Sequence, residues 1–364
     1  MHDRSALTRT VYSFGSALSG QFGHLVLRPD GSIYGYQHPN EQFWELVGDE
    51  LRLLAYDKRV TSRFTYAGEG VWTGRWEGQL RPLYLIPALA LPATAASDGD
   101  SPASAWPPLL VNTVPKSGTY FLEAALRDVG YAPLRLHLVR HDVVFDFRGL
   151  SDDQIHVDPW NQLLELPLNL VTRLLNPGEV VVGHVTSSEV LNAARGQGVC
   201  VVSVVRNLRD VFASYLSFQV QKVAATSAAD RFWRTLDPKQ QLAGFIARFG
   251  DNALADMRQT ATISCLDRDG ILVRYEELTR GVISADAQRR LSAYYSVDFV
   301  QHLTDALLGQ LNTPNPTFSG KRSKWTDIWS DELEVYFNES GFKSINAALG
   351  YEAAGAARIE LSAA

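Results

Sequence analysis

Residues 109–120 read LLVNTVPKSGTY. The apolar run from Leu109 to Val114 predicts a buried strand, and the pattern from Tyr120 to Val129 predicts a helix. The turn between them, Pro115-Lys116-Ser117-Gly118-Thr119, sets backbone N–H groups and a helix N-terminus around one point. Lys116 adds a mobile positive charge, and Gly118 allows close approach of the backbone. The turn therefore fits a phosphate-binding loop, although a plain strand-to-helix connection can have the same composition and the spacing is not that of a Walker A loop.

The chain after this loop alternates buried strands with helical segments. Short apolar runs at residues 180–182, 200–205 and 271–273 predict further strands. Such alternation predicts a parallel sheet with helices on both faces. Residues 240–260 read as one long amphipathic helix, with an apolar stripe that we assign to the core, comprising Leu242, Phe245, Ile246, Phe249 and Leu254.

The N-terminal part has a different hydrophobic pattern. From about residue 23 to residue 86, short apolar runs are separated by turn signals, which predicts a small antiparallel β module. Its Trp and Tyr residues suit either a structural core or an exposed surface for a sugar or a protein partner. An Ala/Ser/Asp/Pro-rich stretch follows. We therefore expect a β-rich module at 1–92, a linker at 93–107 and an α/β domain at 108–364.

Composition narrows the classes of protein. The chain has 364 residues, 46% hydrophobic and 20% charged, which is typical of a globular protein. A formal net charge of −6 disfavours nucleic acid as a partner. Cys200 and Cys265 form no disulfide framework or metal motif. We expect a cytoplasmic protein with no membrane span, because the N-terminus has no signal-peptide core and the apolar stretch at 83–92 is short and contains prolines. The oligomeric state is not readable from the sequence.

A second anion-binding pattern follows the predicted strand at 200–205. It reads Arg206-Asn207-Leu208-Arg209-Asp210, with Ser214 on the helix that follows. An arginine at the end of a strand and a hydroxyl one or two turns into the next helix can hold a phosphate together. Arg206 can equally pair with Asp210 and fix the corner between strand and helix.

Together, the two patterns resemble the PAPS-dependent sulfotransferase family. Residues 115–119 look like its 5′-phosphosulfate loop, and Arg206 to Ser214 look like its 3′-phosphate motif, with Leu208 where the family often has proline. The resemblance covers roughly residues 109–337. It implies a three-layer, P-loop-like α/β fold, with Tyr120 at the start of the helix after the loop also near the nucleotide.

The resemblance also points to a catalytic base. His184 closes a predicted strand 22 residues before Arg206 (206 − 184), similar to the family's catalytic histidine. Imidazole suits the role because its ordinary pKa near 6.5 lets it accept a hydroxyl proton at neutral pH. His137, His141 and His156 are rivals that lack the support of a motif. The second catalytic residue that we expect is Lys116.

Two further segments look like parts of the family's nucleotide site. The segment containing Gly320, Lys321 and Arg322 and ending at Trp325 resembles the Gly-rich basic segment that folds over the nucleotide. It departs from the family because its basic pair follows the glycine instead of preceding it. Tyr275, in Tyr275-Glu276-Glu277-Leu278, matches a family tyrosine near the adenine, and a buried structural role is equally open.

The resemblance implies transfer of a sulfuryl group from PAPS to a hydroxyl or amine, releasing PAP, with no metal. We expect a carbohydrate or specialised-metabolite acceptor and a bacterial-type enzyme. The acceptor loops are expected at 141–176 and 222–240, which carry Phe145, Phe147, Trp160, Phe232 and Trp233. A P-loop nucleotide kinase or NTPase, and an inert glycan- or protein-binding scaffold, are the alternatives.

Overall fold

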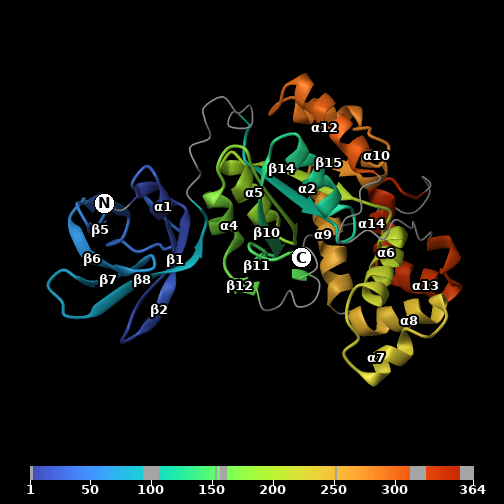
Figure 1. Cartoon of the computed structure of the whole chain (residues 1–364), viewed down its shortest axis with the longest axis horizontal. Coiled ribbons are helices and arrows are strands. Elements are labelled where there is room, and N and C mark those ends of the chain that lie inside the picture. The colour runs from blue at the N-terminus through green and yellow to red at the C-terminus, as the bar shows by residue number, and fades with distance from the viewer. Residues whose placement is uncertain are drawn as a thin grey trace. The chain divides into compact units, whose positions relative to one another are not determined.

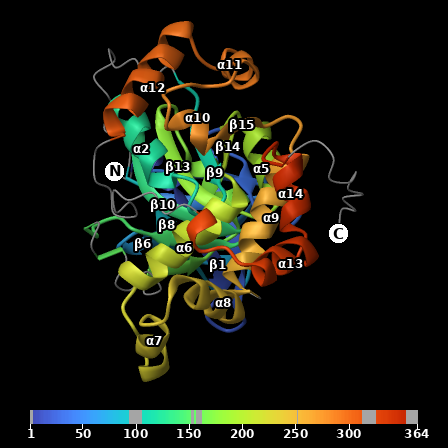
Figure 2. The same ribbon diagram turned by 90° about the vertical axis from the view of Figure 1, so that its right-hand side faces the viewer.

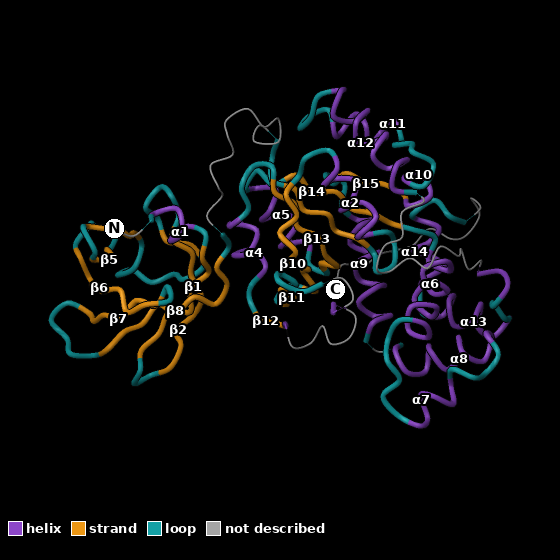
Figure 3. Tube along the Cα trace, in the orientation of Figure 1, coloured by secondary structure: helices purple, strands orange, loops and turns teal. Residues whose placement is uncertain are grey.

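The structure is a computed structural model that describes residues 3–92, 106–151, 154–155, 162–250, 252–311 and 325–352. It divides into two compact units. Unit 1 comprises Met1–Ser104 and Leu164–Asn176, and unit 2 comprises Ala105–Leu163 and Pro177–Ala364. Figure 1 shows the elements of both units, and Figure 3 separates the strands from the helices by colour. The predicted linker at 93–107 falls almost entirely outside the described residues, so the predicted domain limits stay a prediction.

Unit 1 is built on eight antiparallel strands. After a short helix, α1 (Arg4–Thr8), these are β1 (Thr10–Ser16), β2 (Gly20–Leu27), β3 (Ile33–Tyr34), β4 (Phe43–Val47), β5 (Glu50–Leu54), β6 (Val60–Gly68), β7 (Val71–Trp76) and β8 (Pro82–Ala90). Each strand pairs with the next one along the chain, except β3 with β4, and β1 also pairs with β8. Between β3 and β4, the Ile33 amide donates to the Gln42 carbonyl (3.0 Å) and the Trp44 amide to the Gly31 carbonyl (2.8 Å). These bonds close the sheet on itself, so the described strands leave no long unpaired edge.

The interior of unit 1 is filled by large apolar side chains. Trp72, Phe14 and Phe64 are buried with at most 1% of their surface exposed. Phe14 meets the ring of Phe64 edge-to-face at 6.4 Å. Trp44 is 3% exposed, and its indole N–H donates to the Arg28 carbonyl. The expected antiparallel sheet is confirmed, and for Trp44 and Trp72 the structure gives core positions.

A segment from later in the chain completes unit 1. Residues 164–176, which contain α4 (Leu168–Val171) and the 3₁₀ turn η3 (Thr172–Leu174), group with the N-terminal sheet. The side chain of Leu170 lies so close to Gly35 that a Cβ there would be 2.5 Å from Leu170 Cδ2. The Arg9 guanidinium donates to the Leu174 carbonyl, and the Asn169 amide donates to the Tyr34 hydroxyl (3.3 Å).

Unit 2 is a mixed sheet with helices. Its strands are β9 (Leu109–Thr113), β10 (Ala132–Arg140), β11 (Val143–Asp146), β13 (Glu179–Val185), β14 (Cys200–Val205) and β15 (Ile271–Arg274), in the spatial order β11-β10-β13-β9-β14-β15. The short strand β12 (Leu163–Glu165) has its first residue in unit 2 and the other two in unit 1. The pairs β10–β13, β13–β9, β9–β14 and β14–β15 are parallel, whereas β10 and β11 pair antiparallel. The expected α/β class is confirmed, but the sheet is not purely parallel, because a two-residue turn after Arg140 folds β11 back along β10.

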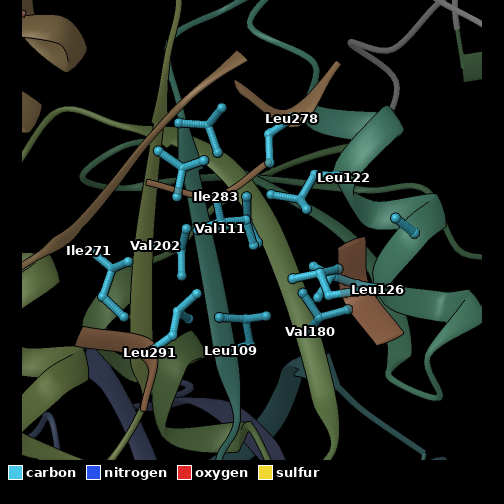
Figure 4. Close-up of a cluster of buried hydrophobic side chains, with 14 of the residues drawn as sticks. Leu109, Val111, Leu122, Leu126, Val180, Val202, Ile271, Leu278, Ile283 and Leu291 are labelled. Atoms are coloured by element: carbon cyan, nitrogen blue, oxygen red, sulfur yellow. The ribbon is translucent and has the colours of Figure 1, made fainter. Parts of the chain in front are cut away.

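Helices cover both faces of this sheet, as Figure 2 shows. One group is α2 (Thr119–Asp128), α11 (Ala285–Leu291) and α12 (Val297–Gln310), which share a core with alternate residues of the central strands, and the short α10 (Tyr275–Leu278) follows β15. Figure 4 shows that core, where Leu109, Val111 and Val202 face Leu122 and Leu126. The second core contains residues of α6 (Leu208–Gln221), α8 (Pro238–Phe249), α9 (Ala253–Leu266), α13 (Asp331–Glu339) and α14 (Phe342–Ala348). The remaining described helices are α5 (Ser188–Gly196), α7 (Ala228–Trp233) and the 3₁₀ turn η4 (Trp325–Asp327).

The prediction of one long helix over residues 240–260 is wrong. The structure has two helices, because α8 ends at Phe249 with Gly250 as its C-cap, and Asn252 is the N-cap of α9. Glycine and asparagine favour helix ends over helix interiors. The core assignment itself is confirmed for Leu242, Phe245 and Leu254, which have no exposed surface.

The packing of residues 164–176 predicts that residues 108–364 do not form a stable domain by themselves. Without the N-terminal sheet, Leu170, which is 2% exposed, loses its packing against Gly35, and the Leu174 carbonyl loses its hydrogen bond from Arg9. Burial of a leucine side chain contributes about 1.5–3 kcal/mol. We expect the fragment 108–364 to aggregate in size-exclusion chromatography, and co-expression with residues 1–107 to restore a soluble complex. A monodisperse fragment with a cooperative melting transition would contradict this.

Candidate functional site

The Pro115–Gly118 loop joins the end of β9 to the start of α2. Lys116 (φ 67°) and Gly118 (φ 91°) both have left-handed backbone conformations, and Gly118 is the N-cap of α2. No described side chain caps this helix, so its first N–H groups point out of the helix end. Among the described residues, the buried hydroxyl of Ser117 also has no hydrogen-bond partner. A loop with two left-handed residues that leads into a helix N-terminus is suited to an anion.

Tyr275 brings this loop together with Arg206. A Cβ on Gly118 would lie 2.7 Å from the Tyr275 ring, so only glycine lets the loop pack against that ring. The guanidinium carbon of Arg206 lies 4.6 Å from the centroid of the same ring. Arg206 also donates from Nη1 to the Lys116 carbonyl at 3.1 Å. The ends of β9, β14 and β15 therefore contribute to one cluster, as the two sequence motifs require.

Ser214 lies on the face of α6 that is turned toward this cluster. It stands one helical turn after Asp210 and one turn before Phe218. Burial raises the pKa of Asp210, and the neighbouring Arg206 opposes that rise. Phe218 packs its ring 4.1 Å from the Nζ of Lys116. The helical period thus places Ser214 between a residue coupled to Arg206 and a residue in contact with Lys116.

Lys116 has an unusual environment for a lysine. Burial, together with the positive charges of Arg206 and Lys222, lowers its pKa from 10.5 to about 7. The positive charges of Lys116, Arg206 and Lys222 lie close enough to repel one another. The arrangement fits an anionic ligand, which would relieve the repulsion.

His184 lies at the end of β13, beside the start of the loop. Its Nδ1 is 2.7 Å from the Thr113 carbonyl oxygen. Because a carbonyl only accepts, Nδ1 carries the proton of the neutral ring, and Nε2 is the free acceptor. The pKa of His184 is lowered to about 4, chiefly by burial; the bond to Thr113 opposes this decrease, and the charge of Lys116 contributes to it. The ring is therefore neutral at pH 7 and can accept a proton at Nε2.

The remaining predicted site residues have varied positions. Thr119 is buried, with its hydroxyl 2.6 Å from that of Thr113, and so links α2 to β9. Pro115 precedes Lys116 in the loop, and the Tyr120 hydroxyl is 3.5 Å from Nδ1 of His137. Gly320, Lys321 and Arg322 lie outside the described residues, as does His156. Trp325, where description resumes, has its backbone N–H bonded to Asp210 beside the Arg206 motif.

The rival histidines differ. The side chain of His141 is 65% exposed and forms an ion pair with Asp142. His137 is buried, and its ring centroid lies 4.6 Å from that of His184. His137 is thus a neighbour of the predicted base.

Sequence reasoning missed three members of the site. Thr113 fixes the tautomer of His184, Phe218 packs on Lys116, and Lys222 adds to the positive charge. Phe218 and Lys222 could have been found, because they follow Ser214 by one and two helical turns. The role of Thr113 depends on its backbone carbonyl, for which a sequence carries no signal.

The expected acceptor loops have mixed roles. Phe145 and Phe147 are buried in a small core with Ile155. Trp233 is buried and donates its indole N–H to the Gln241 carbonyl, whereas Phe232 on α7 is 66% exposed. Trp160 lies outside the described residues. In the part of the chain that the structure describes, no group of three or more His, Cys, Asp or Glu side chains could hold a metal ion, and no helix combines the length and apolar character needed to cross a bilayer.

No protein-family model and no curated protein matches the sequence. Among solved structures, the chain is similar to the crystal structure of a psychrophilic marine protease MP inhibitor, with 15% identity over 23% of this chain and 97% of that chain, and a TM-score of 0.20. It is also similar to mouse sulfotransferase SULT7A1 complexed with PAP, with 11% identity over 68% of this chain and 89% of that chain, and a TM-score of 0.40. Likenesses at this level carry no argument about activity, so the function is argued from the site.

The environment of Lys116 predicts that this side chain destabilises the protein at low pH when no anion is bound. The unfolded chain keeps the lysine proton up to about pH 10.5, whereas the folded chain releases it near pH 7. Between these values the unfolded state binds more protons, so stability rises with pH. Lys116→Met should therefore raise the free energy of unfolding at pH 6 by at least about 1 kcal/mol, and by less at pH 9.

Urea denaturation of wild type and variant at both pH values measures this difference. Lys239→Met, at an exposed lysine of α8, is the control and should change neither value by more than about 0.5 kcal/mol. An equal effect of Lys116→Met at pH 6 and pH 9 would show that the lysine is not perturbed.

Proposed function

We propose that this protein is a PAPS-dependent sulfotransferase that transfers a sulfuryl group to a hydroxyl or amine of a carbohydrate or specialised metabolite. One observation carries the proposal: the Pro115–Gly118 loop and Arg206 converge on Tyr275, while His184 is bonded to the strand end from which the loop starts. Two anion-binding elements and a neutral base within one cluster suit a nucleotide with phosphate groups at two positions.

The two anion-binding elements would divide the nucleotide between them. The N–H groups at the start of α2, with Lys116, suit the 5′-phosphosulfate. Arg206 and Ser214 suit the 3′-phosphate, because a guanidinium binds a phosphate through two parallel bonds and a hydroxyl adds a third donor. Tyr275 lies between the two elements and holds their spacing through its contacts with Gly118 and Arg206.

PAPS supplies an activated sulfuryl group: the acceptor oxygen or nitrogen forms a new bond to sulfur, the bond from sulfur to the 5′-phosphate oxygen breaks, and PAP keeps that electron pair. His184 takes the proton of the acceptor at Nε2, while Nδ1 remains bonded to Thr113. A positioned general base contributes about 10²–10⁴-fold to the rate.

Lys116 would stabilise the leaving group, PAP. A bound anion favours the charged form of a neighbouring lysine, so binding of the anionic nucleotide would return Lys116 to its protonated form. The charged Nζ and the loop N–H groups then stabilise the negative charge that grows on the bridging oxygen, where loss of one donor typically costs about 10²–10³-fold in rate.

The proposal predicts a preference for PAP over other nucleotides. In a thermal-shift assay, PAP should raise the melting temperature of the full chain more than ATP or ADP does. Arg206→Met should remove most of this preference, because it deletes the partner assigned to the 3′-phosphate. Arg231→Met, at an exposed position on α7, is the matched control and should leave it unchanged. A larger shift with ATP would favour the kinase or NTPase alternative, and no shift with any nucleotide would favour a scaffold.

The second prediction concerns turnover. With PAPS and pools of glycan, phenol and lipid acceptors, mass spectrometry should detect a sulfonated product. His184→Ala should bind PAP within a few-fold of wild type and lose at least about 10²-fold in turnover, because only the base is removed. His141→Ala, at an exposed histidine, should keep wild-type turnover. Substantial turnover by His184→Ala would discard the assignment of His184 as the base.

A further inference from the structure

His137 is a buried histidine beside the candidate base. Only 7% of it is exposed. Its ring stands edge-to-face against that of His184, with 4.6 Å between the centroids and 72° between the planes. The Tyr120 hydroxyl is 3.5 Å from its Nδ1, and the ring of Phe147 lies 6.1 Å away. His137 is therefore enclosed by the base, by the helix that follows the loop, and by an apolar side chain.

The backbone of β10 is distorted where it presents His137. Pro133 pairs with Val180 and His137 with Val182, so four steps along β10 match two along β13. Arg135, inside this bulge, has a left-handed φ of 54°. Such strain persists only where the surroundings enforce it, and bulges often re-aim side chains next to active sites.

Contacts of Arg135 hold the bulge in place. Its guanidinium donates to the carbonyls of Leu150 (2.7 Å) and Phe147 (3.3 Å), and its own carbonyl accepts from the Phe147 amide (2.9 Å). With regular pairing, Arg135 would stand opposite Val182, diagonal to the base. The bulge puts a neutral imidazole there in place of a permanent positive charge.

The base needs a partner that tolerates its charged form. Because burial and Lys116 disfavour the imidazolium of His184, proton transfer to Nε2 is uphill. The titratable groups that act on this ring are Lys116 from the loop and His137 from β10, and Tyr120 from α2 reaches it through His137. Burial, followed by the effect of His184, lowers the pKa of His137 well below 6.5, so His137 stays neutral. A neutral, polarisable ring stabilises an adjacent cation, whereas Lys116 opposes it.

We propose that His137 is a positioning residue for His184, which holds the ring of the base edge-to-face and stabilises its imidazolium once the acceptor proton has been taken up. When Tyr120 donates to Nδ1 of His137, the proton of His137 is on Nε2, so Tyr120 fixes its tautomer. This role rests on the proposed function, in which His184 is the base.

The test compares His137→Leu with wild type in the full chain, and His137→Phe, which keeps an aromatic ring, is the matched control. Both variants should keep the affinity for PAP within twofold. The kcat of His137→Leu should fall at least about tenfold, and the acid limb of its kcat profile should move to lower pH, because the imidazolium has lost its partner. His137→Phe should show a much smaller change in both quantities, and Tyr120→Phe should show a small change in the same direction. A folded His137→Leu with wild-type kcat and pH profile would overturn the proposal, and so would a His137→Phe as impaired as His137→Leu.

A second measurement needs no turnover. Proton–nitrogen NMR of the imidazole groups follows the titration of His184 directly in wild type and in His137→Gln. We expect the midpoint for His184 to fall in the variant, and an unchanged midpoint would overturn the proposal even if His137→Leu does not fold. If wild type forms no sulfonated product with any acceptor, the proposed function fails, whereas the coupling between the two histidines is still decided by this titration.

Discussion

The candidate site depends on the parallel pairing of β9 with both of its neighbours. Asn112 stands in register with Gly183 on β13 and with Ser203 on β14. The side-chain oxygen of Asn112 also accepts from the Val185 amide at 2.8 Å, which holds β13 to β9 two residues beyond the last pair on β13. Because the strands run in the same direction, the loop, His184 and Arg206 all emerge at one edge of the sheet. A shift of register on either side would separate the base or the arginine from the loop.

Local sequence patterns were sufficient to predict the strands and the helix start that position the site. The runs that became β9, β13 and β14 are apolar because those strands are buried on both faces, and such runs can be recognised without a structure. Gly118 and Thr119 likewise mark the start of α2. Strand β10 was missed because Pro133 and Arg135 interrupt its apolar pattern, and they do so at the bulge that presents His137.

The features that could not be predicted from local sequence patterns depend on long-range contacts. The packing of Leu170 against Gly35 joins residues far apart in the chain, and neither residue signals the other. The closeness of His137 to His184 depends on a register shift, and that of Lys222 to Lys116 on the direction of α6. The residues Gly320, Lys321 and Arg322 lie outside the described part of the chain, so their assignment rests on the sequence resemblance alone.

The segment at residues 164–176 affects the order in which the chain can fold during synthesis. The strands of unit 1 leave the ribosome first, but their last partner is made only after β9, α2, β10 and β11. Unit 1 therefore cannot complete its fold until a large part of unit 2 has been synthesised. Residues 1–100 also cannot be exchanged as an independent module, because a replacement would have to accept Leu170 and the Leu174 carbonyl, which lie a few residues before the strand that carries His184.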